Sequence, residues 1–169
     1  PQKAKQILEE KKLLPMKFTL KVPNSSKIYL DTAQSIKEQL KEVGITVNLE
    51  IIEWATWLSD VYTNRKYEAS LAGLAGKMEP DAILRRYTST YAKNFTNFNN
   101  PKYDALIEEA KRTSNEAKQV ENYKEAQKIL AEEQAAIFLM DPNTIIATEK
   151  GLEGFEFYPL PYFNFAKLY

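Results

Sequence analysis

The side chains available for chemistry are few in kind, because the 169 residues include no histidine and no cysteine. This composition removes the commonest general base, thiolate catalysis, zinc–thiolate sites and disulfides. Catalysis would have to use paired carboxylates, a serine–lysine arrangement, tyrosine or lysine. The acidic pairs Glu9–Glu10, Glu108–Glu109 and Glu132–Glu133 lie beside basic residues in charged helical patterns. We interpret them as solvated helix faces, and predict no metal site and no cofactor.

A second candidate for chemistry is the stretch "LAGLAGKMEPDAI", residues 71–83, which holds Gly73 and Gly76. A phosphate-binding Walker A loop is excluded, because Leu71 takes the place of its first glycine and Met78 that of its Ser or Thr. The GxxG clamp of KH-type RNA-binding domains joins two helices, whereas a strand pattern leads into this stretch. The favoured interpretation is a strand-to-helix turn in which glycine supplies unusual backbone angles, and such a turn is compatible with a ligand site.

Charge and hydropathy narrow the function classes further. The chain has 23 basic and 23 acidic residues, so its formal net charge is zero, which argues against nucleic acid as a partner. Its hydrophobic content of 44% suits one ordinary domain with a real core. No apolar run approaches the ~20 residues of a membrane span.

Apolar periodicity in the first half alternates between the helical and the strand period. It predicts helices over 3–12, 29–43 and 54–64 and strands over 17–22, 45–52 and 67–74. Strands separated by helices imply a mainly parallel sheet, and such sheets bind ligands outside the carboxyl ends of their strands. Residues 73–77 and Trp54 would lie at such ends.

The second half is predicted to be mostly helical. We expect a helix from Pro80 to about Tyr87, one from Pro101 with Tyr103, Leu106, Ile107 and Ala110 facing inward, and one showing Val120, Tyr123, Gln127 and Leu130 on one face. Thr113 and Glu116 match a capping box for the last of these. Residues 136–140 read as a short strand and 144–148 as a further one. The aromatic tail, residues 151–169, is expected to pack as an extended arm.

Aromatic residues near these ends have two interpretations each. Trp54 and Trp57 are three residues apart, which is typical of one core face of a helix, but Trp54 would also suit the wall of a cleft. The aromatic residues of the polar region that follows suit a ligand wall or a packing surface: Tyr87, Tyr91, Phe95 and Phe98.

Four motifs in order resemble a known family: "LKEVGITVNLEIIEW", "YEASLAGLAGKMEPDAIL", "NFTNFNNPKYDALIEEAK" and "YKEAQKILAEEQAAIFL". Together they are similar to the C-terminal lobe of the peptide- and nickel-type extracellular solute-binding proteins of ABC importers, over nearly the whole chain. The resemblance implies an α/β, periplasmic-binding-protein-like lobe over residues 1–150 and a tail over 151–169 that returns to a first lobe. Since the chain begins within a helical pattern and without Met, we expect a piece of a longer protein.

The resemblance also implies a function without covalent chemistry. A small solute, peptide-like or other, would be captured between this lobe and an N-terminal lobe of the same chain, and then delivered to ABC permease subunits. The protein would not be an enzyme. It would be extracytoplasmic, either free in a periplasm or lipid-anchored on the outer face of the bacterial membrane.

The ligand loop of that family falls on Gly73 to Asp81. Within it we expect Gly73, Leu74, Ala75, Gly76 and Lys77 to line the cleft, and Trp54, Tyr91 and Phe95 are further candidates. Leu74 stands where peptide binders typically carry Trp. Lys77 lies nearest the position of an Asp that pairs with the peptide ammonium group, unless a shift of register brings Glu79 there. A lysine favours a carboxylate or a phosphate instead, so the solute stays open.

Two other functions stay open at this point. A small α/β enzyme using carboxylates or a serine–lysine pair predicts turnover and acidic groups converging in one pocket. A protein-interaction module would use the aromatic tail as its docking surface.

Overall fold

The computed structural model describes residues 1–143, 145–158 and 162–169, and the chain divides into two compact units. The first unit is Pro1–Leu74 and the second is Ala75–Tyr169. Each unit is a continuous stretch of chain with its own buried core, and each is described separately.

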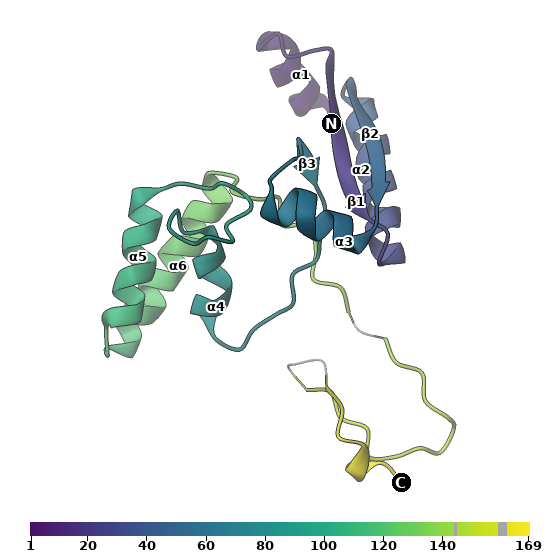
Figure 1. Ribbon diagram of the computed structural model, residues 1–169, viewed down its shortest axis with the longest axis vertical. Coiled ribbons are helices and arrows are strands. Elements are labelled where there is room, and N and C mark those ends of the chain that lie inside the picture. The colour runs from purple at the N-terminus through teal and green to yellow at the C-terminus, as the bar shows by residue number, and fades with distance from the viewer. Residues whose placement is uncertain (144, 159–161) are drawn as a thin grey trace. The chain divides into compact units, whose positions relative to one another are not determined.

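The first unit is built on a parallel sheet of three strands in the order β2-β1-β3 (Figure 1). The strands are β1 (Met16–Pro23), β2 (Ile45–Ile52) and β3 (Ala69–Ser70). The whole of β1 pairs with β2, from Met16 opposite Ile45 to Pro23 opposite Ile52. The predicted parallel sheet is therefore confirmed, and β1 and β2 lie where the alternation of apolar residues indicated.

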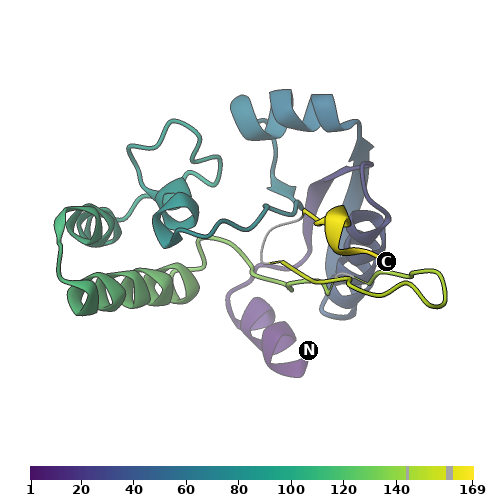
Figure 2. The same ribbon diagram turned by 90° about the horizontal axis from the view of Figure 1, so that it is seen from below.

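Helices cover both faces of this sheet (Figure 2). α1 (Gln2–Glu10) precedes β1, and α2 (Lys27–Glu42) packs on the face that carries Leu20 and Val22. The opposite face, which carries Lys21, is covered by α3 (Trp54–Thr56) and its continuation η1 (Trp57–Thr63), which is a π-helix. The sequence predicted one helix over 54–64, so its extent is confirmed and its widened helical turn is a new finding.

Local capping explains where α2 begins and ends. The Ser26 hydroxyl accepts a hydrogen bond from the Ile28 amide at 3.3 Å, which satisfies one free donor of the first turn. Gly44 follows the helix with φ at +87°, and the Leu14 side chain lies 3.1 Å from where a Cβ would stand. The predicted glycine stop is confirmed, since a side chain there would be both strained and crowded.

The third strand is much shorter than the predicted range of 67–74, because its ladder with β1 is interrupted at both ends. Only Leu20–Ala69 and Lys21–Ser70 pair. Before them, the Thr19 amide donates to the Glu68 side chain at 2.7 Å rather than to a backbone carbonyl. Beyond them, Pro23 stands where β1 would next donate to β3, and proline has no N–H.

The second unit is helical, as predicted, with α5 and α6 side by side (Figure 1). Its elements are α4 (Pro80–Leu84), the 3-10 turn η2 (Arg85–Tyr87), α5 (Pro101–Arg112), α6 (Glu116–Glu132) and the 3-10 turn η3 (Phe165–Lys167). Tyr103, Ile107 and Ala110 of α5 are buried against α6, which confirms the predicted inner face. The Tyr103 hydroxyl donates to the Leu84 carbonyl at 2.6 Å and so fixes the end of α4.

Two details of α6 were predicted wrongly. The cap is Asn115, whose side chain accepts from the Lys118 amide at 3.1 Å, while Thr113 accepts from the Asn115 amide instead of forming a capping box. The buried face is also rotated from the predicted one: Val120 and Gln127 are exposed, and the residues that pack inward are Asn122, Tyr123, Ala126, Ile129 and Leu130.

Residues 136–140 do not form the predicted strand. A strand requires a neighbour for its backbone hydrogen bonds, and none of the described segments pairs with this one. Its last four apolar side chains, at residues 137–140, are exposed, Ile137 at 77%. Of the predicted strand at 144–148, Thr144 lies outside the described residues, and 145–148 show no strand.

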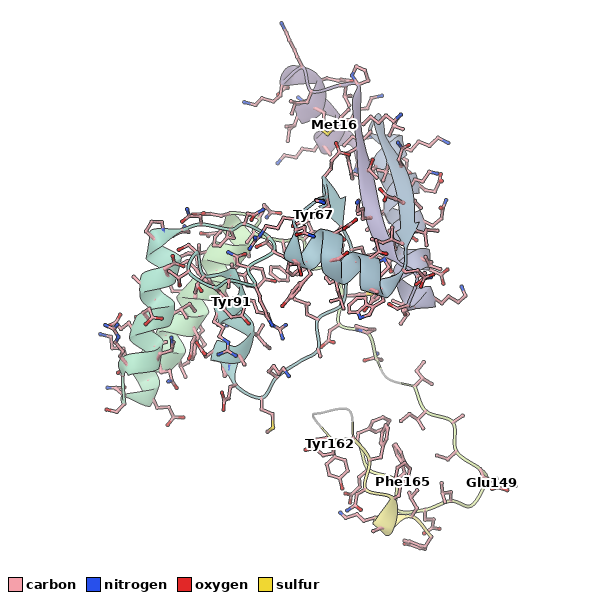
Figure 3. All side chains as sticks on the ribbon, viewed as in Figure 1. Met16, Tyr67, Tyr91, Glu149, Tyr162 and Phe165 are labelled. Carbon is pink, nitrogen blue, oxygen red and sulfur yellow. The ribbon has the colours of Figure 1, made fainter. Side chains whose placement is uncertain are left out.

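The tail doubles back on itself. Glu153 and Tyr169 exchange two backbone hydrogen bonds, at 2.9 and 3.3 Å. The rings of Phe155 and Phe163 lie 5.6 Å apart between them, on the same segment as the Tyr162 and Phe165 side chains of Figure 3. The described residues on the two sides of the tail, 151–158 and 162–169, therefore contact each other, which differs from the expected extended arm.

Among the described residues, none of the helices has both the length and the apolar character needed to cross a membrane.

Replacing Tyr103 with Phe should lower the free energy of unfolding by about 1–3 kcal/mol, because the buried Leu84 carbonyl loses its donor. Urea denaturation followed by far-ultraviolet circular dichroism measures the change, since α5 and α6 contribute to that signal. Tyr162→Phe, at an exposed ring in the tail, is the matched control. Equal midpoints for the two variants would show that the hydroxyl contributes nothing.

Candidate functional site

The three parallel strands end at one edge of the sheet, and polar groups connect the exits of β1 and β2 there. The Asn24 amide donates to the Ile52 carbonyl at 2.9 Å. The Asn24 side chain donates to the Glu53 carboxylate at 2.5 Å. This pair holds the two strand exits together and leaves the residue after Glu53, which is Trp54, at the same edge.

Of the two interpretations of the tryptophans, the core position applies to Trp57 and the exposed position to Trp54. Trp57 is a core residue with 2% of its surface exposed, whereas Trp54 is 40% exposed. Their rings stack with centroids 5.0 Å apart and an interplanar angle of 3°. Trp54 thus presents one flat apolar face to solvent on a rigid aromatic floor, which suits contact with an apolar or planar group of a ligand.

Gly73 leaves β3 at this edge and lies against α2. A Cβ on Gly73 would stand 2.7 Å from the Tyr29 hydroxyl, so glycine permits a close approach of backbone to that ring. Neither Gly73 nor Gly76 has a positive φ, and the prediction that both supply unusual backbone angles is wrong. At Gly76 nothing lies within 4 Å of a built Cβ.

Residues 74–77 form the link from the first unit to the second, with the boundary between Leu74 and Ala75. All four are exposed, Leu74 at 44%. Lys77 makes no hydrogen bond or ion pair with any residue in the described part of the chain. The segment therefore offers accessible backbone, one apolar side chain and one cation that is not neutralised locally.

The other two predicted ligand residues belong to the second unit, on the loop between η2 and α5. Buried Asn94 organises this loop, because its side chain donates to the carbonyls of Thr88 and Phe98 at 3.1 and 2.8 Å. Tyr91, labelled in Figure 3, is half-buried, and the Arg85 guanidinium lies 5.8 Å from its ring centroid. Phe95 is also half-buried.

Of the remaining loop aromatics, Tyr87 and Phe98 pack in the core of the second unit. For these two residues the packing interpretation is therefore correct. Sequence spacing alone did not separate them from Tyr91 and Phe95.

The acidic pairs are bound in surface contacts, as expected of solvated helix faces. Hydrogen bonding from Lys111 and its charge hold the pKa of Glu108 below its ordinary value. A hydrogen bond from Lys118 does the same for the pKa of Glu109. Both stay ionised at neutral pH, which is unsuited to a general acid. In the described part of the chain, no three acidic residues come together as metal ligands would.

The hollows on α5 and α6 do not involve the predicted ligand residues. One is lined by Ala105, Glu108, Glu109, Arg112 and Thr113, and it is an open depression among solvated ion pairs. The other lies along exposed residues of α6 with Leu106. Their charged, open lining argues against either as a small-molecule site, and we assign the candidate site to the strand ends instead.

Sequence reasoning missed three residues that build this edge: Asn24, Tyr29 and Ser70. Asn24 stands two residues after the end of a predicted strand, so the rule for parallel sheets pointed to it. Tyr29 and Ser70 carried no local signal, since their roles depend on contacts with Gly73 and Trp57 across the fold.

Comparison with known families decides the identity of the fold. A family model described as "Bacterial extracellular solute-binding proteins, family 5 Middle" matches residues 1–95. The chain belongs to this family. The match contains all three strands and every predicted ligand residue, so the resemblance seen in the sequence is confirmed.

Individual members of family 5 support the same conclusion. The oligopeptide-binding protein AppA of Bacillus subtilis (strain 168) is 30% identical over 145 residues, 84% of this chain and 27% of AppA. The structure of AppA in complex with a nonapeptide superposes with a TM-score of 0.70 at 27% identity, over 79% of this chain and 30% of that one. The chain spans about a quarter to a third of the length of the curated relatives it matches first.

A structure of a dipeptide binding protein from Pseudoalteromonas sp. SM9913, in complex with Met-Leu, matches 99% of this chain and 35% of its own. The TM-score is 0.75 at 21% identity, which supports the fold alone. The predicted periplasmic-binding-protein-like α/β fold is thus confirmed.

The unequal exposure of the two tryptophans gives a direct test of the edge. In Trp57→Phe the remaining Trp54 fluorescence should be strongly quenched by acrylamide, and in Trp54→Phe the remaining Trp57 should be shielded. Stern–Volmer constants from the two variants measure this difference. Equal constants would mean that Trp54 is not presented to solvent as described.

The acidic helix face is tested by titration. In Lys118→Met the pKa of Glu109 should rise to its ordinary range, because its hydrogen-bonded cation is removed. Because the pKa of Glu109 is lower in the folded than in the unfolded state, its ionisation stabilises the folded state at pH values above the unfolded pKa. That stabilisation is lost as the pH falls through the folded pKa. Carbon-detected NMR titration measures the pKa, with Lys124→Met as control. A wild-type Glu109 pKa above the ordinary range would instead favour acid–base catalysis.

Proposed function

We propose that this chain is the ligand-binding lobe of an extracytoplasmic solute-binding protein that captures a peptide or other small solute for an ABC importer. The observation that carries the proposal is the edge where the three parallel strands end. There the exposed face of Trp54, the bare backbone at Gly73 and the accessible Leu74 follow strand exits fixed by internal hydrogen bonds. Membership of family 5, and the peptide-binding names of its members, support the same function.

The lobe is one of two in a longer chain. Residues 1–150 form the second lobe in this proposal, and residues 151–169 return to the first. Support comes from the share of each relative that the chain covers and from the exposed apolar residues at 137–140. Closure of two lobes desolvates the solute between them, and the solute's contacts with both hold the closed state.

Ligand contacts from this side are assigned to Gly73, Leu74, Ala75, Gly76 and Lys77, together with Trp54, Tyr91 and Phe95. The small residues let a ligand approach the backbone, where N–H and C=O groups bind an extended peptide without reading its side chains. Lys77 adds a positive charge without a carboxylate partner among the described residues. It favours a carboxylate of the solute over an ammonium group.

Binding of this kind needs no bond making or breaking, and the protein is proposed not to be an enzyme. Glu108 and Glu109, whose carboxylates the alternative of a small enzyme would use, are held in ion pairs with Lys111 and Lys118. No observation favours the interaction module over a binding lobe. The site of action is the periplasm or the outer face of the bacterial membrane, with permease subunits as the docking partner of the closed form.

The proposal predicts that the reading frame encoding this chain also encodes a first lobe upstream. It also predicts that the complete protein binds peptides of two to nine residues with a Kd of about 1 μM or lower. Isothermal titration calorimetry measures this affinity. The 169-residue chain should bind the same peptides far more weakly, because one side of the contacts is missing.

Trp54→Ala in the complete protein should weaken binding by about tenfold, as expected for loss of an apolar contact face. Ile7→Ala, at an exposed apolar residue of α1 in the same unit, serves as the control. Hydrolysis of the peptides, or a start codon placed directly before Pro1, would count against the proposal.

A further inference from the structure

A partly buried relay of two hydrogen bonds connects three elements of the first unit. The Trp57 indole N–H donates to the Ser70 hydroxyl at 2.9 Å. The same hydroxyl donates to the Lys21 backbone carbonyl, also at 2.9 Å. The side chain of one serine therefore connects η1, β3 and β1 by hydrogen bonds.

The relay matters for β3 because the backbone ladder of that strand is short. Its ladder with β1 has two residue pairs, and the Leu71 amide adds a longer bond to the Lys21 carbonyl at 3.3 Å. Gly73 follows Ser70 by three residues, a reach of at most about 11 Å. The direction in which the chain leaves toward Gly73 thus depends strongly on where the Ser70 hydroxyl is anchored.

The other end of the relay determines the position of Trp54. Its ring lies flat on Trp57, so it follows the plane of the ring below. That plane is fixed by the indole hydrogen bond to Ser70 and by the widened turn of η1, in which the Asn64 amide reaches back to the Ser59 carbonyl at 2.9 Å. Widened helical turns of this type frequently occur beside functional sites.

The Lys21 side chain completes the arrangement on the same face of the sheet. Its ammonium group lies 3.6 Å from the Glu50 carboxylate and 3.9 Å from that of Asp60, a residue of η1. Lys21 therefore contacts β3 through its carbonyl, and β2 and η1 through its ammonium group. The Trp57 N–H and the Ser70 hydroxyl both donate to partners inside the fold, which suits them to positioning other groups.

We propose that Trp57 and Ser70 are positioning residues of the ligand edge, which fix Trp54 on one flank and the exit toward Gly73 on the other without touching the solute. The part of this statement that concerns the solute rests on the proposed function. The part that concerns geometry is independent of any ligand. A single hydroxyl then controls two separate contact surfaces of the site.

The geometric part is tested on the 169-residue chain, which contains only two tryptophans. With ¹⁵N-labelled tryptophan, Ser70→Ala should shift the indole N–H resonances of both Trp57 and Trp54, and should speed exchange of the Trp57 indole proton. Ser70→Thr restores the hydroxyl and both resonances. Thr46→Ala removes an exposed hydroxyl of β2 that has no part in the relay, and should leave both unchanged.

Trp57→Phe probes the same relay from its donor, because it keeps an aromatic floor and removes the N–H. It should shift the Trp54 resonance in the same direction as Ser70→Ala. A Trp54 resonance that stays in place in both variants would overturn the proposal, since Ser70 would then be a local contact of Trp57 alone.

The solute part is tested by calorimetry on the complete protein well below its unfolding temperature. Ser70→Ala should weaken peptide binding about tenfold, while Ser70→Thr and Thr46→Ala stay within about twofold of the wild type. Unchanged affinity in Ser70→Ala would overturn the positioning role in binding. If the wild type binds no peptide, the proposed function fails. The two indole resonances then decide by themselves whether the relay positions Trp54.

Discussion

The backbone pairing of β1 with β2 is the constraint on which the rest of the first unit depends. Eight residues of β1 pair in parallel with eight of β2, so both strands must end at the same edge of the sheet. Parallel pairing also requires a crossover, and α2 supplies it while covering Leu20 and Val22. With that register fixed, Asn24 and Glu53 meet as a hydrogen-bonded pair, and Trp54 is placed directly beyond them. A shift by one residue would turn Leu20 and Val22 toward η1 and Lys21 toward α2.

Much of this fold was available from periodicity. Alternating apolar residues identified β1 and β2, helical spacing identified α2 and α5, and the glycine after α2 marked its end. The failures have specific physical causes. β3 is short because a glutamate side chain and a proline without N–H interrupt its ladder, and neither is an apolar pattern. Residues 136–140 have the composition of a strand, but composition does not supply the neighbouring strand that would pair with it.

The candidate site shows the same division between local and non-local information. Residues 73–77 and Trp54 were predicted from the rule that parallel sheets bind ligands at the carboxyl ends of their strands. The reason for glycine at position 73 was not predictable, because the Tyr29 ring that excludes a side chain there is 44 positions earlier in the sequence. The relay through Ser70 is also non-local, since it joins residues 13 and 49 positions away.

The division of the chain at Leu74 has a consequence for the order in which the molecule folds. Each unit is one continuous segment, so every residue of the first core has been synthesised before the second unit begins. Proteins commonly fold in this sequential manner, with the N-terminal part first. Gly73 and Leu74 are thus translated directly after the strands that position them and before the helices that follow. The segment assigned to the ligand is then the last part of the unit translated first and the first part of the unit translated second.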